Sequence, residues 1–232
     1  MNEFHSLGST DVMNVTYRPP MIDVSSFQLR PHNYFHEECR KDLIVLHFTA
    51  GTSVGGALNH WESDPRRIAT AFVVDVDGQI YQTFPPQFWA YALGKGVPTR
   101  NDERAIQIEM VNRGPLVRRD DQLCWWPKDF TTPFCLSKEE NLYIEKLWRG
   151  YGYWTVYTAG QIRAVFQLTR YLCDRFQIPK AVPVDKIQVA DVSFFSGWQG
   201  ICGHQNFRSD KTDPGPAFPW QQLVDFLNRK SE

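Results

Sequence analysis

The sequence predicts an α/β domain with a central mixed sheet and helices on both faces. Segments with β-type patterning alternate with segments of helical spacing, an order typical of this class. A chain of 232 residues suits one large domain. We expect residues 1–40 to form an N-terminal arm on the domain. Residues 41–232 then form the domain itself, with an insertion at about 113–136.

Prolines, an apolar run and helix-capping residues predict the first structural elements of the chain. Prolines make residues 1–40 irregular, because they interrupt regular structure. Residues 42–48 are short and continuously apolar, which indicates a buried strand. Thr52 or Ser53 is a suitable cap for a short helix that runs to about Trp61.

The middle of the chain has two clear β signals. Asp77 and Gly78 lie between two β-rich runs, which predicts a hairpin. Residues 105–112 alternate in polarity, as a half-buried strand does. One face of this strand carries Ile106, Ile108 and Met110. The opposite face carries Gln107 and Glu109, so Glu109 points away from the apolar side.

The second half of the chain is expected to begin with an inserted hairpin and to continue mainly as helices and loops. Residues 113–136 are rich in proline, tryptophan and charge, which favours a hairpin. Ser137-Lys138-Glu139-Glu140 fits a capping box and predicts a helix to about Trp148. The remaining predicted elements are a helix over 158–176, a loop over 177–199, a strand over 200–204, a polar loop and a C-terminal helix.

Charge and composition exclude several classes of partner. The net charge is −1, so nothing favours a nucleic acid or an anionic membrane as partner. No apolar stretch approaches about 18 residues, the length that spans a membrane. The N-terminus lacks an apolar signal-peptide core. We expect a cytoplasmic protein, or one exported without a cleaved signal during phage lysis or by a secretion system.

The five cysteines form no zinc-ribbon or thioredoxin-type pair. Their odd number favours a reducing compartment. A bridge between Cys124 and Cys135 remains open.

Two histidines and a loop point to metal chemistry. His47 lies near the end of the strand at 42–48 and His204 at the end of the strand at 200–204, where each strand meets a loop. The loop "GHQNFRSDKTDPGP" also contains Asp210, Lys211 and Asp213, and its prolines and glycine restrict its shape. Catalytic zinc takes imidazole and carboxylate ligands from three residues and leaves one position for water. Asp213 is the expected third ligand.

These segments, in this order, resemble the zinc-dependent N-acetylmuramoyl-L-alanine amidases, which share a fold with the peptidoglycan recognition proteins. The resemblance covers roughly residues 40–228, and its most specific parts are His47 and the loop from His204 to Pro216. It implies His47, His204 and Asp213 as Zn²⁺ ligands. It also implies Glu109 as the residue that assists the attacking water and Lys211 as the residue that stabilises the oxyanion.

Some positions depart from the family pattern, and some alternatives stay open. Residues 90–94 lack the histidine that many members carry beside the cleft, and a tyrosine that assists in some members is absent near Thr70. Asp210 or Cys202 remain alternative ligands, while Glu109 as an exposed strand residue and Lys211 as a solvated lysine remain alternative interpretations. His32, His36 and His60 are expected at the surface.

The expected function is hydrolysis of the amide bond between N-acetylmuramic acid and L-alanine in peptidoglycan or muropeptides, by a monomer. Two other hypotheses are a binding module without turnover and a zinc hydrolase of the same fold acting on another amide. Candidate substrate contacts are Trp125, Trp126, Arg118 and Tyr91. These four are weaker candidates than the ligands, because packing explains aromatic residues equally well.

Overall fold

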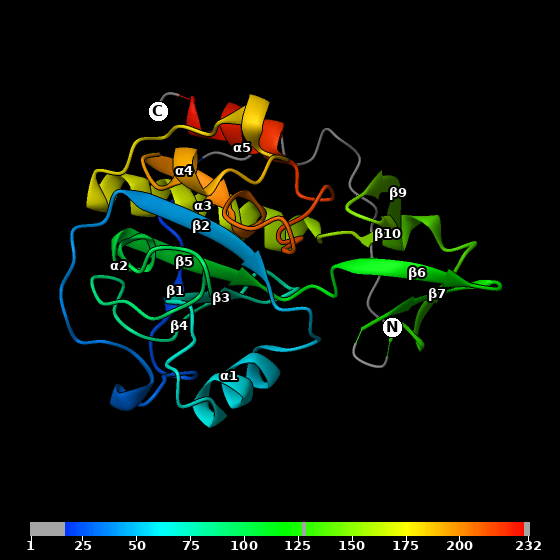
Figure 1. Cartoon of the computed structure of the whole chain (residues 1–232), viewed down its shortest axis with the longest axis horizontal. Coiled ribbons are helices and arrows are strands. Elements are labelled where there is room, and N and C mark those ends of the chain that lie inside the picture. The colour runs from blue at the N-terminus through cyan, green and yellow to red at the C-terminus, as the bar shows by residue number, and fades with distance from the viewer. Residues whose placement is uncertain (1–16, 127–128, 230–232) are drawn as a thin grey trace.

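A six-stranded mixed sheet forms the centre of the molecule in the computed structural model, which describes residues 17–126 and 129–229 (Figure 1). The strand order is β1-β4-β3-β5-β2-β11. The strands are β1 (Ile22–Asp23), β2 (Leu43–Phe48), β3 (Phe72–Val74), β4 (Ile80–Gln82), β5 (Ala105–Met110) and β11 (Gly200–Gly203). Strands β3, β5, β2 and β11 run parallel to one another, and β4 runs antiparallel to β3. The predicted mixed sheet is confirmed.

Helices cover both faces of this sheet. They are α1 (Val54–Ser63), α2 (Arg100–Arg104), α3 (Ala159–Phe176), α4 (Val192–Phe195) and α5 (Trp220–Leu227). Alternate side chains of a strand face opposite sides, so β2 divides its residues between two cores. Ile44 and Leu46 join a large buried cluster with the apolar side of α3. Leu43 and Val45 join a second cluster with Phe195 of α4.

Local signals placed several of these elements correctly. The Ser53 hydroxyl accepts a hydrogen bond from the Gly56 amide and caps α1, as expected. Thr158 caps α3 by accepting from the Gln161 amide. Strands β3 and β4 form the predicted hairpin, in which Gly78 takes the left-handed conformation at φ 92°. Glycine has no Cβ, and it adopts this backbone without steric cost.

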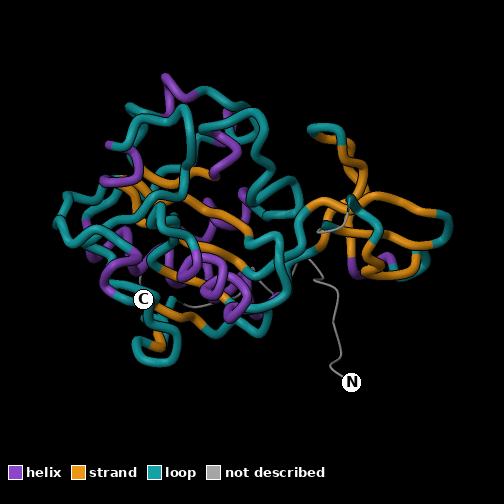
Figure 2. The backbone as a smooth tube through the Cα atoms, turned by 60° about the horizontal axis from the view of Figure 1, so that its bottom comes forward, coloured by secondary structure: helices purple, strands orange, loops and turns teal. Residues whose placement is uncertain are grey.

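A second sheet of five antiparallel strands projects from the main body as a separate lobe (Figure 2). Its order is β8-β7-β6-β10-β9. The strands are β6 (Pro115–Arg119), β7 (Gln122–Trp125), β8 (Thr132–Leu136), β9 (Tyr143–Trp148) and β10 (Tyr151–Thr155). Leu116, Leu123, Cys135 and Tyr143 give this sheet a small core of its own.

The helix predicted from Ser137 to Trp148 is wrong. Those residues contain one 3-10 turn, Glu140–Leu142, followed by strand β9. Glu139 mimics a capping box, but its carboxylate accepts from the Leu136 amide at 2.7 Å and closes a turn. Tyr143 is buried against Tyr153 of β10, and this cross-strand pair outweighs the helical propensity of Glu, Lys and Leu.

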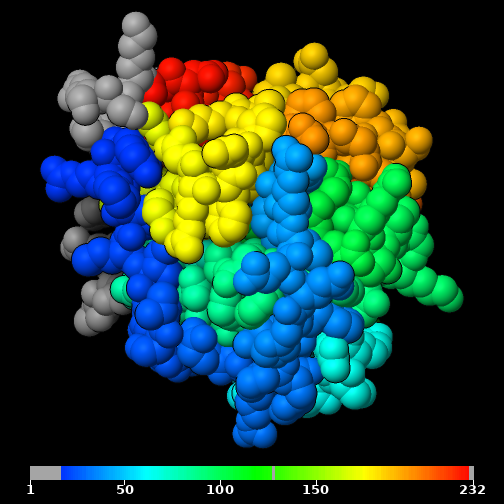
Figure 3. All heavy atoms as spheres, turned by 90° about the vertical axis from the view of Figure 1, so that its left-hand side faces the viewer, coloured from blue at the N-terminus to red at the C-terminus, as the bar shows by residue number. Residues whose placement is uncertain are grey.

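The described part of the N-terminal segment lies against the sheet and α3. Strand β1 pairs with β4, Leu29 is buried, and the Arg170 guanidinium lies 4.5 Å from the centre of the Tyr17 ring. Figure 3 shows this blue segment beside the yellow residues that include α3. The first 16 residues of the predicted arm, which include the segment examined for a signal peptide, lie outside the described residues.

Three smaller findings complete the fold. The loop predicted over 177–199 also contains the short helix α4 and a 3-10 turn, Val184–Lys186. The Asp191 carboxylate caps α4 by accepting from the Phe194 amide. All five cysteines are free, Cys124 and Cys135 included. Among the described helices, none combines the length and apolarity needed to cross a membrane.

Candidate metal centre and active site

Parallel pairing brings the candidate site residues to one edge of the central sheet. His47 lies near the end of β2 opposite Glu109 of β5, and His204 directly follows β11. The carboxyl ends of parallel strands meet at the same edge, which is where α/β sheets usually carry their sites. His47 alternates with Leu43 and Val45, so it faces the α4 side of the sheet.

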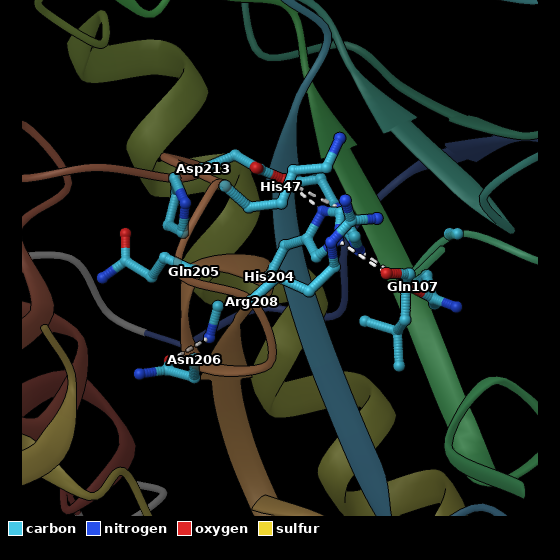
Figure 4. A network of polar contacts seen from close by, with 12 residues as sticks. His47, Gln107, His204, Gln205, Asn206, Arg208 and Asp213 are labelled. Carbon is cyan, nitrogen blue, oxygen red and sulfur yellow. Dashed lines mark hydrogen bonds and ion pairs between the residues drawn. The ribbon is translucent and has the colours of Figure 1, made fainter. Parts of the chain in front are cut away.

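His47, His204 and Asp213 converge into one buried group. Ligand atoms from the three residues lie within 4.8 Å of one another. One carboxylate oxygen, Asp213 Oδ2, is 3.0 Å from the Nδ1 atoms of both imidazoles (Figure 4). The three residues are 3%, 4% and 6% exposed, so water has little access to their polar atoms. The site therefore combines residues separated by 166 positions along the chain.

The Nε2 atom of His47, which faces away from Asp213, contacts a buried network of polar side chains. His47 Nε2 lies 2.7 Å from the side-chain oxygen of Gln107. The amide nitrogen of Gln107 donates at 2.7 Å to Asp102, and this bond orients the amide so that its oxygen faces His47. Asp102 Oδ1 also accepts from the backbone amides of Ala92 and Leu93 at 2.9 and 3.0 Å.

The Nε2 atom of His204, which faces away from Asp213, contacts the same hydrogen-bond network through Leu93. His204 Nε2 lies 3.1 Å from the carbonyl oxygen of Leu93. Leu93 thus supports His204 through its carbonyl and binds Asp102 through its amide. Burial raises the pKa of Asp102, and the donors that reach its carboxylate oppose this effect. Both imidazoles are fixed through one buried carboxylate.

These contacts determine which ring nitrogens are protonated. Both Nε2 atoms face carbonyl-type oxygens, so both carry the proton and donate. The Nδ1 atom of each imidazole then faces Asp213 Oδ2. Burial raises the pKa of Asp213, but the nearby His204 and His47 outweigh it, and this pKa lies well below its ordinary value. Two imidazole nitrogens and one carboxylate oxygen that converge in this way can bind one cation together, and Zn²⁺ fits this donor set.

Glu109 and Lys211 lie within electrostatic reach of this group. Glu109 is half-buried on the same strand face as Gln107, two residues further along β5. Burial raises the pKa of Glu109 to about 7, while His47 and Lys211 lower it and Asp213 raises it. A carboxyl group with a pKa near neutrality is suited to accept and return a proton.

The turn after Asp213 has dedicated supports that the sequence did not reveal. The hydroxyl of buried Tyr157 donates to the Pro214 carbonyl at 2.7 Å. The Gln205 amide donates to the Asp213 carbonyl at 2.9 Å, and its side-chain oxygen accepts from the Gly215 amide. Tyr157, Gln107 and Asp102 are the functional supports that sequence reasoning missed. The available signal was weak, since a polar residue on a strand that borders a core has many possible partners.

The alternative ligands lie elsewhere. Among the described residues, the potential metal-binding group contains Asp213 and not Asp210. Asp210 is exposed and forms an ion pair with Arg208 at 2.5 Å. Cys202 is buried in the apolar cluster behind the site, where burial raises the pKa of its thiol.

The four candidate substrate contacts are divided between two regions. Trp125 packs at the core of the five-stranded sheet, and Arg118 lies over the ring of Tyr153 in the same sheet. Trp126 is 49% exposed and close to Phe130. Tyr91 is half-buried and lies two residues before Leu93, which supports the site.

Solved structures with a similar fold include an N-acetylmuramyl-L-alanine amidase. AmiD from E. coli, solved with the substrate anhydro-N-acetylmuramic acid-L-Ala-D-γ-Glu-L-Lys, has a TM-score of 0.51 at 20% identity, over 82% of this chain and 59% of that chain. The catalytic domain of XlyA has a TM-score of 0.51 at 16% identity, over 89% and 99% of the two chains. A mutant endolysin from Bacillus subtilis has a TM-score of 0.51 at 15% identity, over 90% and 99%.

Comparison with curated proteins finds no match. The family model for N-acetylmuramoyl-L-alanine amidase matches residues 38–216, a range that contains both histidines, Glu109 and the loop to Asp213. The chain belongs to the N-acetylmuramoyl-L-alanine amidase family, as the resemblance in its sequence indicated.

Proposed function

We propose that this protein is a zinc-dependent amidase that hydrolyses the bond between the lactyl group of N-acetylmuramic acid and L-alanine. Family membership supports peptidoglycan amidase activity. The observation that carries the finer proposal is the convergence of His47, His204 and Asp213 beside Glu109. AmiD shares the fold and was solved with a muropeptide substrate, and we propose a substrate of the same class for this chain.

The chain's own residues provide a proton carrier and a cation for this reaction. Zn²⁺ held by His47, His204 and Asp213 would supply Lewis acidity for activating water and polarising the carbonyl. Glu109 accepts a proton from the attacking water and later passes it to the departing alanine nitrogen. Lys211 stabilises the negative charge that develops on the carbonyl oxygen. One water is consumed, and a carboxylate and an amine are released.

Substrate contacts outside this centre form a second part of the proposal. We assign Tyr91, Trp126, Trp125 and Arg118 to recognition of the glycan or the peptide. Trp126 and Arg118 are exposed and available for contact, whereas Trp125 is partly used by the core of its own sheet.

The test compares two aspartates of the same loop. Protein loaded with one equivalent of zinc is incubated with purified muropeptides, and the products are identified by mass spectrometry. We expect release of free peptide with an L-alanine amino terminus. Asp213→Asn should lose both zinc and activity, whereas Asp210→Asn, which alters an exposed carboxylate, should keep both. Zinc-loaded wild-type protein that binds muropeptide and leaves it whole would instead indicate a binding module.

A further inference from the structure

An arginine of the five-stranded sheet forms hydrogen bonds with the site loop. Strands β9 and β10 are joined by the two-residue turn Arg149-Gly150, in which Trp148 pairs with Tyr151. Arg149 and Gly150 have φ values of 47° and 83°. Positive φ at both positions is the geometry of a tight hairpin turn.

Arg149 donates hydrogen bonds to three backbone carbonyls of the loop that connects the two candidate ligands. Its guanidinium reaches Gln205 O at 2.8 Å, Arg208 O at 3.0 Å and Lys211 O. The guanidinium also lies 4.5 Å from the centre of the Trp148 ring, which restricts its position. A planar fork with five N–H donors suits several acceptors, whereas a lysine ammonium is a single point charge.

The two ligands at the ends of this loop are fixed by other contacts. His204 is held by the Leu93 carbonyl through its ring nitrogen. The Asp213 carbonyl accepts from the Gln205 amide, and Tyr157 holds the next carbonyl along the chain. Arg149 therefore holds the backbone between the two ligands at three points, one of which is Lys211, and contacts neither ligand side chain directly.

We propose that Arg149 is a positioning residue that places Lys211 for the reaction. Through Arg149, the five-stranded sheet helps to fix the geometry of the active site. This inference rests on the proposed function for its kinetic consequences. Its structural consequence, an ordered loop over residues 206–212, is independent of any reaction. Loss of the three hydrogen bonds leaves the Lys211 backbone free to shift, and a displacement of about 1 Å is enough to reduce catalysis by about 100-fold.

The experiment uses Arg149→Met, which keeps an unbranched stem over Trp148 and removes every donor. We expect kcat to fall by about 10- to 100-fold with a smaller change in KM. Zinc affinity should stay within about threefold of the wild-type value, because the ligands keep their own supports. Arg175→Met is the matched control, since Arg175 also lies over aromatic rings but is exposed on α3.

A double-mutant cycle separates positioning from general stability. If Arg149 acts through Lys211, Arg149→Met should reduce kcat by less than about twofold in a Lys211→Ala background. Amide hydrogen exchange should accelerate in residues 206–212 and stay unchanged in the central strands. Additive losses of kcat, or exchange that accelerates equally throughout the chain, would overturn the proposal.

Two further readouts keep the result unambiguous. Arg149→Lys retains the charge and the stem, so it tests the fork if the methionine variant does not fold. It should give an intermediate kcat and an intermediate loop exchange rate, and wild-type values of both would refute the role of the fork. Absence of amidase activity in the wild-type protein would refute the proposed function. Faster amide exchange confined to residues 206–212 in Arg149→Met would still support the positioning role.

Discussion

Replacement of Gln107 by leucine should weaken zinc binding without touching a ligand. Leucine has a similar size, but it removes the oxygen that accepts from His47 Nε2 at 2.7 Å. The imidazole then has no partner to keep its proton on Nε2. The proton moves to Nδ1, where Asp213 Oδ2 at 3.0 Å is a ready acceptor. Zinc must displace this proton before it binds.

The size of the effect follows from the bonds that change. A buried N–H left without an acceptor costs about 1–3 kcal/mol, and this cost sets how strongly the alternative tautomer is favoured. Since about 1.4 kcal/mol corresponds to a factor of ten, zinc affinity should fall by about 10- to 100-fold. Asp102 keeps two backbone donors, so the surrounding fold should remain intact.

The assay is competition between the protein and a chromogenic zinc chelator. Gln161→Leu provides a matched control, because Gln161 is also buried and donates to the carbonyls of Val74 and Val111, away from the histidines. That variant should lose stability to urea and keep its zinc affinity. Unchanged zinc affinity in Gln107→Leu, or an equal loss in Gln161→Leu, would refute the role assigned to the network.

Two further predictions concern a titration and a turn. Burial raises the pKa of Glu109 from 4.5 to about 7 in the folded protein, so the metal-free fold binds this proton more tightly than the unfolded chain does. This contribution to stability is complete below the unfolded value and is lost as the pH rises through about 7. Urea denaturation between about pH 4 and pH 8 should therefore show a smaller decline for Glu109→Gln than for the wild type, and an identical decline would contradict the shift. Gly78→Ala should destabilise the fold by about 1–3 kcal/mol more than Gly96→Ala does. Both glycines have φ near 90°, but only at Gly78 would a Cβ lie 2.6 Å from a backbone oxygen, and equal urea midpoints for the two variants would exclude this contact as the cause.

The elements of the central domain were predictable because their signals are local. The apolar run of β2 and the alternating pattern of β5 indicate strands whatever their partners are. Ser53 and Thr158 cap their helices within three residues, and Gly78 specifies its own turn. The candidate ligands were also recognisable, since His47 and His204 lie at strand ends and Asp213 lies in a loop that resembles the family pattern.

The five-stranded sheet was only partly predictable because its stability depends on pairing between segments. The first hairpin was expected, but β9 contains residues that favour a helix when considered alone. Its strand structure comes from contact with β10 through Tyr143 and Tyr153, and from the turn at Arg149. Neither contact is visible in a local window. Gln107 and Asp102 were missed for a similar reason, because their roles depend on which side chains neighbouring strands bring together.

The register between β2 and β5 connects the hydrophobic core directly to the chemistry. Ile44 pairs with Ile106 and Leu46 with Ile108, and this pairing sets His47 opposite Glu109. Side chains alternate along a strand, so a shift by one residue would move Gln107 and Glu109 to the α3 face and bring Ile106 and Ile108 to the site. Such a shift would bury a carboxyl group in an apolar core and remove the acceptor of His47 Nε2. The apolar residues that stabilise the sheet therefore also determine which polar residues surround the candidate metal centre.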